Sequence, residues 1–392
     1  MEAINDKIHS ALGPSAAHRW LHCPASVKLE AQFPDKAGES AAEGTLAHAL
    51  CELKLKHYFF TKELTKKKYT AEVKKLKQDP LWNDEMEGYT DVYLDYIKKL
   101  ALSMPAAPYV AIEKHLDMSK YVPGCYGTGD CILIQGETLH VIDFKYGKSP
   151  NGRVQAEENP QMLLYALGAY QAYGFLYPMK KVVLHIVQPR LTDGITSWET
   201  DIDYLMEFAC IAAEQAGIAM SDAAYFSPSE KACRYCKAGA ICKARAEENA
   251  KLQREIKKDP ELLSPSEIGS YLEIGEDIHQ WLETLKAYAL VQCLNGKEIP
   301  GWKAVEGRGS RDWTDADEAF RKLTEGGIKE EMLYERKPLT LAQTEKTVGK
   351  KIFEELVGDL VTKKPGKPAL VPESDKRPAI TNKPSAAEAF GN

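Results

Sequence analysis

The sequence of 392 residues contains no uninterrupted apolar stretch of the ~18 to 20 residues that a membrane-spanning helix needs. Its first residues contain no apolar run typical of a secretory signal peptide. The Gly-x4-Gly-Lys-Ser/Thr motif of P-loop proteins is also missing, so any motor that works with this chain must be a separate protein. We therefore expect a cytoplasmic protein without a membrane partner.

Positive charge is not in excess, since 51 Lys and Arg residues stand against 57 Asp and Glu residues and give a net charge of −6. This balance excludes a cationic field over the whole surface, so any contact with nucleic acid requires a local patch. Lysines are densest within residues 61–78, and we interpret this segment as a solvated surface rather than a contact with a DNA backbone.

The nine cysteines are an odd number in a long chain and do not form the compact set of a secreted disulfide framework. Reduced thiols or metal ligands are the better interpretation. Three of them have a Cys-x2-Cys-x5-Cys spacing at Cys233, Cys236 and Cys242, which is one thiolate short of a tetrahedral site. The sequence therefore predicts a fourth ligand from elsewhere in the chain.

Hydrophobic patterns in the first two thirds of the chain predict an α/β protein. Apolar spacing indicates helices near residues 15–30, 43–60, 84–103, 155–174 and 204–220. Short runs rich in Val, Ile, Leu and aromatic residues indicate strands at Tyr109–Leu116, Tyr126–Gln135, Thr138–Lys145, Lys181–Gln188 and Ser197–Ile202. A glycine-containing turn joins the second and third strands into a hairpin. The expected architecture is a mixed central sheet flanked by helices.

The predicted hairpin carries two acids and a lysine near one end. Side chains alternate between the faces of a strand, so Asp143 and Lys145 point to the same side. Asp130 lies on the partner strand and can meet Asp143 at the end of the sheet. Two close carboxylates need a cation between them, and hard oxygen ligands suit Mg²⁺ or Mn²⁺. A lysine beside such an ion can position a water or neutralise charge on a phosphate oxygen, as phosphodiester cleavage requires.

Around this hairpin the sequence resembles the PD-(D/E)XK nuclease superfamily, whose signature is an acid, a hairpin and then Asp/Glu-x-Lys. It is similar in particular to the RecB-like exonuclease branch, because three further landmarks follow the order of that branch. They are Gly-Thr-x-x-His at residues 44–48, a strand glutamate at Glu113, and Gln-x-x-x-Tyr at residues 161–165. The resemblance covers residues from about 15 to 246 and implies a restriction-endonuclease-like core with a helical C-terminal extension.

The resemblance also implies roles for these residues. One or two Mg²⁺ or Mn²⁺ ions would be ligated by His48, Asp130, Asp143 and the carbonyl of Phe144. Lys145 would activate or position the attacking water, and Glu113 would assist as a ligand or through water. Gln161 and Tyr165 would hold the scissile phosphate or the nearby backbone.

In some members of the same branch, namely AddB-like proteins and CRISPR-associated RecB-like exonucleases, one cysteine before the nuclease core and three after it hold a [4Fe–4S] cluster. Cys23 would then join Cys233, Cys236 and Cys242. A Zn²⁺ ion on the same four thiolates is the alternative. Either group would tie residue 23 to residues 233–242 and close the loop of chain that contains the site.

By this resemblance the chain is a metal-dependent DNA exonuclease for end processing or recombination, acting on single-stranded DNA or on ends. The resemblance is compatible with a phage-encoded enzyme in the host cytoplasm that works with a separate helicase, recombinase or annealing protein. The alternatives are a non-catalytic nucleic-acid-binding module on the same scaffold and a structural zinc protein. We divide the chain into a nuclease domain (1–250), a mostly helical region of unassigned role (251–360) and a Pro- and Lys-rich tail expected to be disordered (361–392).

Overall fold

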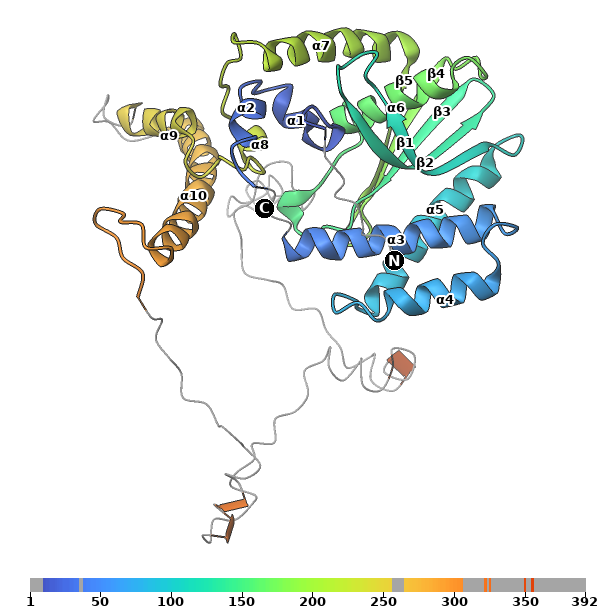
Figure 1. Cartoon of the computed structure of the whole chain (residues 1–392), viewed down its shortest axis with the longest axis horizontal. Coiled ribbons are helices and arrows are strands. Elements are labelled where there is room, and N and C mark those ends of the chain that lie inside the picture. The colour runs from blue at the N-terminus through green and yellow to red at the C-terminus, as the bar shows by residue number, and fades with distance from the viewer. Residues whose placement is uncertain are drawn as a thin grey trace, which may run out of the picture. The chain divides into compact units, whose positions relative to one another are not determined.

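A five-stranded sheet forms the centre of the first of two units, Met1–Ala304, into which contacts divide the chain (Figure 1). The computed structural model describes residues 10–34, 38–255 and 264–305, and the single positions 321, 322, 324, 325, 349, 354 and 355. The strands follow one another in chain order as β1 (Tyr109–Asp117), β2 (Tyr126–Gln135), β3 (Thr138–Phe144), β4 (Lys181–Val187) and β5 (Ile195–Asp201). β3 and β4 are parallel, and the other neighbours are antiparallel. The fold is the mixed α/β, restriction-endonuclease-like core expected from the sequence.

Successive side chains of the central strands enter two apolar layers, one on each face of the sheet. Ile132 and Val141 pack toward α6 (Pro160–Tyr173) and α7 (Ile202–Met220). Leu133 and Ile142, one residue further along each strand, pack toward α3 (Glu39–Phe59) and α5 (Glu85–Ser103). Because both faces are covered, these strands are apolar on both sides. α6 makes the crossover between the parallel strands β3 and β4, which brings its first turn to the C-terminal end of β3.

Two helix predictions need correction. The single helix predicted near 15–30 is wrong, since this segment forms η1 (Pro14–Ala16), α1 (Ala17–Trp20) and α2 (Ser26–Glu30). The turn between α1 and α2 contains Pro24, which lacks an N–H and disfavours a helical conformation of the residue before it. The helix predicted to start near 155 begins at Pro160, because the Asn159 side chain accepts hydrogen bonds from the first free backbone N–H groups.

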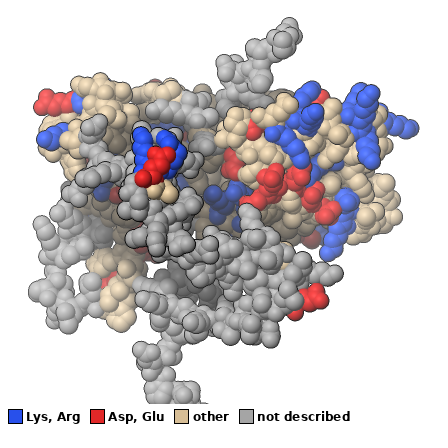
Figure 2. Space-filling view, turned by 90° about the horizontal axis from the view of Figure 1, so that it is seen from below, with Lys and Arg blue, Asp and Glu red and all other residues tan. Residues whose placement is uncertain are grey.

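The lysine-rich segment forms α4 (Lys66–Leu76), which packs on α3 through the stacked rings of Tyr69 and His57. Two of its lysines are paired with acids, Lys75 with Glu72 in the helix and the adjoining Lys77 with Glu87 of α5. The described part of the face seen in Figure 2 likewise shows acidic side chains among the basic ones. The positive charge on this face is therefore diluted by neighbouring carboxylates.

Beyond the sheet the chain is helical, as α8 (Glu230–Cys233), α9 (Lys243–Glu255) and α10 (Pro265–Leu294). Arg245 pairs with Asp277 at 2.8 Å, and the Trp281 indole N–H donates to the Ala240 carbonyl, so α10 is tied to the cysteine segment. No helix among the described residues is long and apolar enough to cross a bilayer. The tail predicted at 361–392 lies outside the described residues, and the domain boundaries at 250 and 360 stay predictions.

Candidate functional site

Three side chains that can ligate a metal meet at one end of the sheet. His48 comes from the middle of α3, Glu113 from β1 and Asp130 from β2, and one ligand atom of each lies within 4.8 Å of the other two. The neighbours Ala47 and Leu50 are fully buried against the sheet, which holds α3 with His48 turned inward. In the part of the chain that the structure describes, no other group of three His, Cys, Asp or Glu side chains converges as closely.

Glu113 reaches this group through an irregularity in β1. Ile112 pairs with Cys131 and Lys114 pairs with Gly129, but Glu113 and Asp130 face each other without a regular pairing. The φ angle of Glu113 is +47°, a left-handed conformation that costs a non-glycine residue about 1–3 kcal/mol. Like charges directly opposite on neighbouring strands add a further cost. A cation bound between the two carboxylates would offset that electrostatic cost.

The carboxylates of this group favour the protonated form of His48. Burial lowers the pKa of His48, but the Asp130 carboxylate, with Oδ2 3.4 Å from His48 Nδ1, outweighs it and raises this pKa to about 9. Burial likewise opposes ionisation of Asp130, yet His48 and a hydrogen bond from the Phe144 N–H lower the pKa of this carboxyl. The imidazolium is thus stabilised by the same carboxylates that would bind a metal ion.

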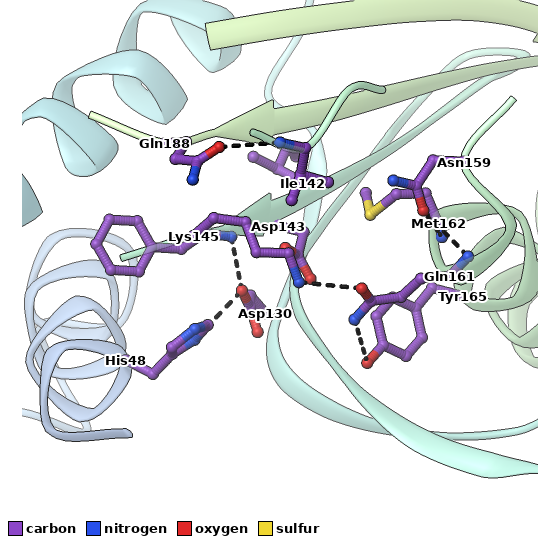
Figure 3. Close-up of polar contacts among 12 residues, drawn as sticks. His48, Asp130, Ile142, Asp143, Lys145, Asn159, Gln161, Met162, Tyr165 and Gln188 are labelled. Carbon is purple, nitrogen blue, oxygen red and sulfur yellow. Dashed lines mark hydrogen bonds and ion pairs between the residues drawn. The ribbon is translucent and has the colours of Figure 1, made fainter. Parts of the chain in front are cut away.

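A second polar row adjoins the first, on β3 and α6 (Figure 3). Lys145 Nζ lies 3.0 Å from Asp143 Oδ2 and donates to Gln161 Oε1, also at 3.0 Å. The Gln161 amide donates in turn to the Tyr165 hydroxyl at 3.3 Å. Burial raises the pKa of Asp143, and Asp130 raises it further against the opposing effect of Lys145. Asp143 Oδ2 accepts no hydrogen bond of good geometry although it is buried, so it retains capacity for another ligand.

The structure thus brings the predicted site residues together but distributes them differently. The sequence predicts Asp143 as a metal ligand and Glu113 as an assisting residue, whereas Glu113 belongs to the closest group and Asp143 lies against Lys145. Phe144 contributes its N–H to Asp130 and its ring to an edge contact with His48. The Phe144 carbonyl as a ligand stays a prediction.

Two residues that the sequence analysis did not single out hold the loop after β3. Gln188 accepts from the Val154 N–H and donates to the carbonyls of Gly147 and Gly152. Arg190 packs over the Tyr146 ring, 4.4 Å from its centre, and its guanidinium contacts Glu43 of α3. Both residues lie in the polar run directly after the apolar strand β4. The C-terminal ends of the parallel strands β3 and β4 meet there, so this position could have indicated a role near the site.

The four cysteines singled out in the sequence line one cavity away from the sheet. Cys23 lies between α1 and α2, and the others come from α8 and the turn after it. Arg19 pairs with Glu30 at 2.7 Å, and Glu30 also accepts the Lys237 N–H, which joins the two segments. No three of the four sulfurs lie within 4.8 Å of one another. The two cysteine segments therefore converge on one cavity.

Comparisons with known proteins identify a family but no function. A family model described as "Protein of unknown function (DUF2800)" matches residues 9–378. Among solved structures, the crystal structure of SSO0001 has 17% identity and a TM-score of 0.22, covering 51% of this chain and 85% of that one. An alkaline exonuclease, LHK-Exo from Laribacter hongkongensis, has 12% identity and a TM-score of 0.21, covering 44% of this chain and 88% of that one.

Proposed function

We propose that this chain, which belongs to the DUF2800 family of proteins of unknown function, is a nuclease that hydrolyses phosphodiester bonds with a divalent metal ion. The observation that carries the proposal is the placement of the His48, Glu113 and Asp130 group beside the Asp143–Lys145 pair at one end of the sheet. A cluster of hard ligands next to an ammonium group is suited to phosphate chemistry.

The donor set fits Mg²⁺ or Mn²⁺. Its ligands would be His48, Glu113 and Asp130, with Asp143 Oδ2 as a further donor because this buried oxygen has only the Lys145 ammonium group beside it, at 3.0 Å. Carboxylate oxygens with one imidazole are acceptable to both ions. When bound, such an ion supplies Lewis acidity toward a phosphodiester oxygen.

The other residues would orient the reacting groups. In hydrolysis a water oxygen bonds to phosphorus, one P–O bond breaks, and the departing oxygen takes up a proton. Lys145 is held by Asp143 and Gln161, so its ammonium group is positioned to orient the water or to neutralise charge on a phosphate oxygen. Because the Tyr165 hydroxyl accepts from Gln161, its own O–H remains to donate to the substrate.

The resemblance to RecB-like exonucleases supports DNA as the substrate and attack from ends. The same proposal includes a role in end processing or recombination and a phage origin. It also includes a separate helicase, recombinase or annealing protein as partner. The alternative is a non-catalytic nucleic-acid-binding module on the same scaffold.

The test is hydrolysis of end-labelled linear DNA by the full chain with Mg²⁺, with Mn²⁺ and with EDTA, and circular DNA separates exonuclease from endonuclease action. We expect metal-dependent loss of the linear substrate that Asp143→Ala and Lys145→Ala each slow at least ~100-fold. Activity unchanged in both variants would remove the proposal. DNA binding without hydrolysis under any divalent ion would select the binding module.

We propose further that the four cysteines hold a [4Fe–4S] cluster. The four cysteines line one cavity, which supports a shared group, and the resemblance to RecB-like exonucleases favours an iron–sulfur cluster over Zn²⁺. The guanidinium of Arg245 reaches the Cys233 carbonyl, which places positive charge beside an anionic cluster. The cluster would close the nuclease domain between residues 23 and 242.

Iron and sulfide analysis after anaerobic purification tests the cluster. We expect a brown protein with broad absorption near ~400 nm that Cys236→Ser abolishes and Cys210→Ser, at an exposed cysteine outside the cavity, leaves unchanged. Colourless protein that contains zinc would select the alternative.

A further inference from the structure

The longest helix among the described residues, α10, carries large apolar side chains on its surface. None of its residues is buried, although Asp277 and Trp281 anchor one side of it to the cysteine segment. The exposed fractions of four apolar residues near its two ends lie between 46% and 70%, and these residues are Ile268, Leu272, Leu290 and Leu294. Because burial of an apolar face is what normally stabilises a helix, we examined α10 as a contact surface.

The four residues belong to one stripe on the side of α10 that faces away from its anchors. Residues three or four positions apart lie on the same face of a helix. Steps of three and four residues lead from Ile268 to Leu294 through Glu276 and Lys286. The anchoring Trp281 lies on the opposite side. At 1.5 Å per residue this outer stripe, as we call it, is about 39 Å long.

The apolar ends of the outer stripe match each other when a second copy of the helix runs in the opposite direction. Ile268 and Leu294 lie thirteen residues on either side of position 281, and Leu272 and Leu290 lie nine residues on either side of it. In an antiparallel pair of helices centred on this position, each of them faces an apolar side chain of the other copy. Such a pair has two-fold symmetry, in which both copies use the same patch.

The charged middle of the outer stripe fits the same arrangement. Glu276 and Lys286 lie five residues on either side of position 281 and would meet across the pair, and His279 and Glu283 are likewise opposite each other. All four side chains are exposed, and within one chain Lys286 pairs with Glu283 at 2.9 Å. In a parallel pair Glu276 would meet a second glutamate and Lys286 a second lysine. The charges therefore favour the antiparallel pair.

We propose that α10 binds α10 of a second copy of this chain along the outer stripe, antiparallel and centred on position 281. The apolar ends provide the buried surface, and the charged middle fixes the register and the direction of the two helices. The contact uses none of the residues assigned to the metal group or to the cysteine cavity. The dimer is therefore independent of the proposed nuclease function.

Sedimentation equilibrium of the full chain over a series of concentrations measures the pairing. We expect the mass to rise from the 43.7 kDa of one chain to twice that value. Lys286→Glu places two acids opposite each other at both symmetric contacts and should weaken the dimer at least about tenfold, and Glu276→Lys should do the same with two bases.

The double variant of Glu276→Lys and Lys286→Glu restores opposite charges and should recover the dimer. Lys286→Glu also removes the contact with Glu283 inside the chain, and the double variant keeps this loss. Recovery in the double variant therefore reports the contact between copies rather than a change within the helix.

A matched pair of variants tests the apolar part of the contact. Leu272→Gln should weaken the dimer about tenfold. Ile274→Gln removes a side chain that is also exposed, at 41%, but lies two residues along and outside the outer stripe, so it should leave the dimer unchanged. Thermal unfolding at a concentration where the chain is monomeric should give the same Tm for both variants.

Three results would overturn the proposal. The first is the mass of a single chain at every concentration. The second is a dimer of equal affinity in Leu272→Gln and Ile274→Gln, which would assign the contact to another surface. The third is a double variant as weak as Lys286→Glu alone, which would exclude the antiparallel register. Hydrolysis of DNA by a monomeric chain would remove the dimer and leave the nuclease function standing.

Discussion

Glu113 on β1 faces Asp130 on β2, and a carboxylate oxygen of each lies within 4.8 Å of the other and of a His48 ring nitrogen. Two acids at this separation repel each other, and the backbone of Glu113 is in a left-handed conformation. Such costs persist in a folded protein where the surrounding structure enforces them, and they are frequent at functional sites. A cation bound between the two carboxylates would relieve the electrostatic part of this cost.

Addition of Mn²⁺ should therefore stabilise the protein. At a free concentration of 100 times Kd, binding to the folded state alone adds about 2.7 kcal/mol to the free energy of unfolding. In Asp130→Asn this increase should disappear, while the amide oxygen still accepts the Phe144 N–H. Thermal unfolding of both proteins with and without Mn²⁺ is the measurement, and an equal rise in Tm in both would contradict the assignment of Asp130 as a ligand.

Glu113→Gly and Glu113→Ala should differ in stability although both remove the same carboxylate. Glycine adopts a φ of +47° without steric cost, so Glu113→Gly should be about 1 kcal/mol more stable than Glu113→Ala in urea unfolding. Both should lose metal-dependent hydrolysis. Equal stabilities would mean that the backbone relaxes when the carboxylate is removed.

Lys145→Ala should separate metal binding from chemistry. Its ammonium group contacts Asp143 and Gln161 and is outside the three-residue ligand group, so affinity for Mn²⁺ measured by calorimetry should not fall. Hydrolysis should fall at least ~100-fold, as when one preorganised donor to a developing charge is lost. Lys180→Ala, at an exposed lysine paired with Glu137, is the matched control and should retain full activity. Loss of Mn²⁺ affinity in Lys145→Ala would disprove this division of roles.

Stability should fall as the pH drops from 6.5 toward 4 because of a histidine pair on the neighbouring strands β3 and β4. His185 is hydrogen-bonded to Tyr96 and to His140, and burial lowers the pKa of His185 to about 3 and that of His140 to about 4. The unfolded chain takes up protons near pH 6.5, before the folded chain does. The contribution is therefore present above pH 6.5 and is lost at lower pH, by up to about 1.4 kcal/mol per pH unit for each histidine.

His185→Gln, whose amide does not titrate, should reduce this pH dependence by about half. The exposed His279→Gln is the control and should leave it unchanged. Urea unfolding between pH 7 and about 4.5 measures the slope. The same slope in both variants would assign the pH dependence to other groups.

The hydrophobic pattern was sufficient to predict the five strands and the helices α3, α5 and α7, because strand and helix periods are local properties of the chain. It predicted one helix where Pro24 separates α1 from α2, since apolar spacing does not record a missing backbone donor. The start of α6 was placed too early for a related reason, because the cap at Asn159 depends on one side chain.

The proximity of Asp130, Asp143 and Lys145 could be predicted from the chain, because the three residues lie close to one hairpin and alternation along its strands is regular. The division of the acids between the metal-ligand group and the contact with Lys145 could not be predicted from the chain. Glu113 reaches the ligand group through a break in the pairing of β1 with β2, and that break depends on the register of two strands and on the packing of α3 behind them. The sequence analysis did not single out Gln188 and Arg190, because their hydrogen-bond and ion-pair partners are distant in sequence.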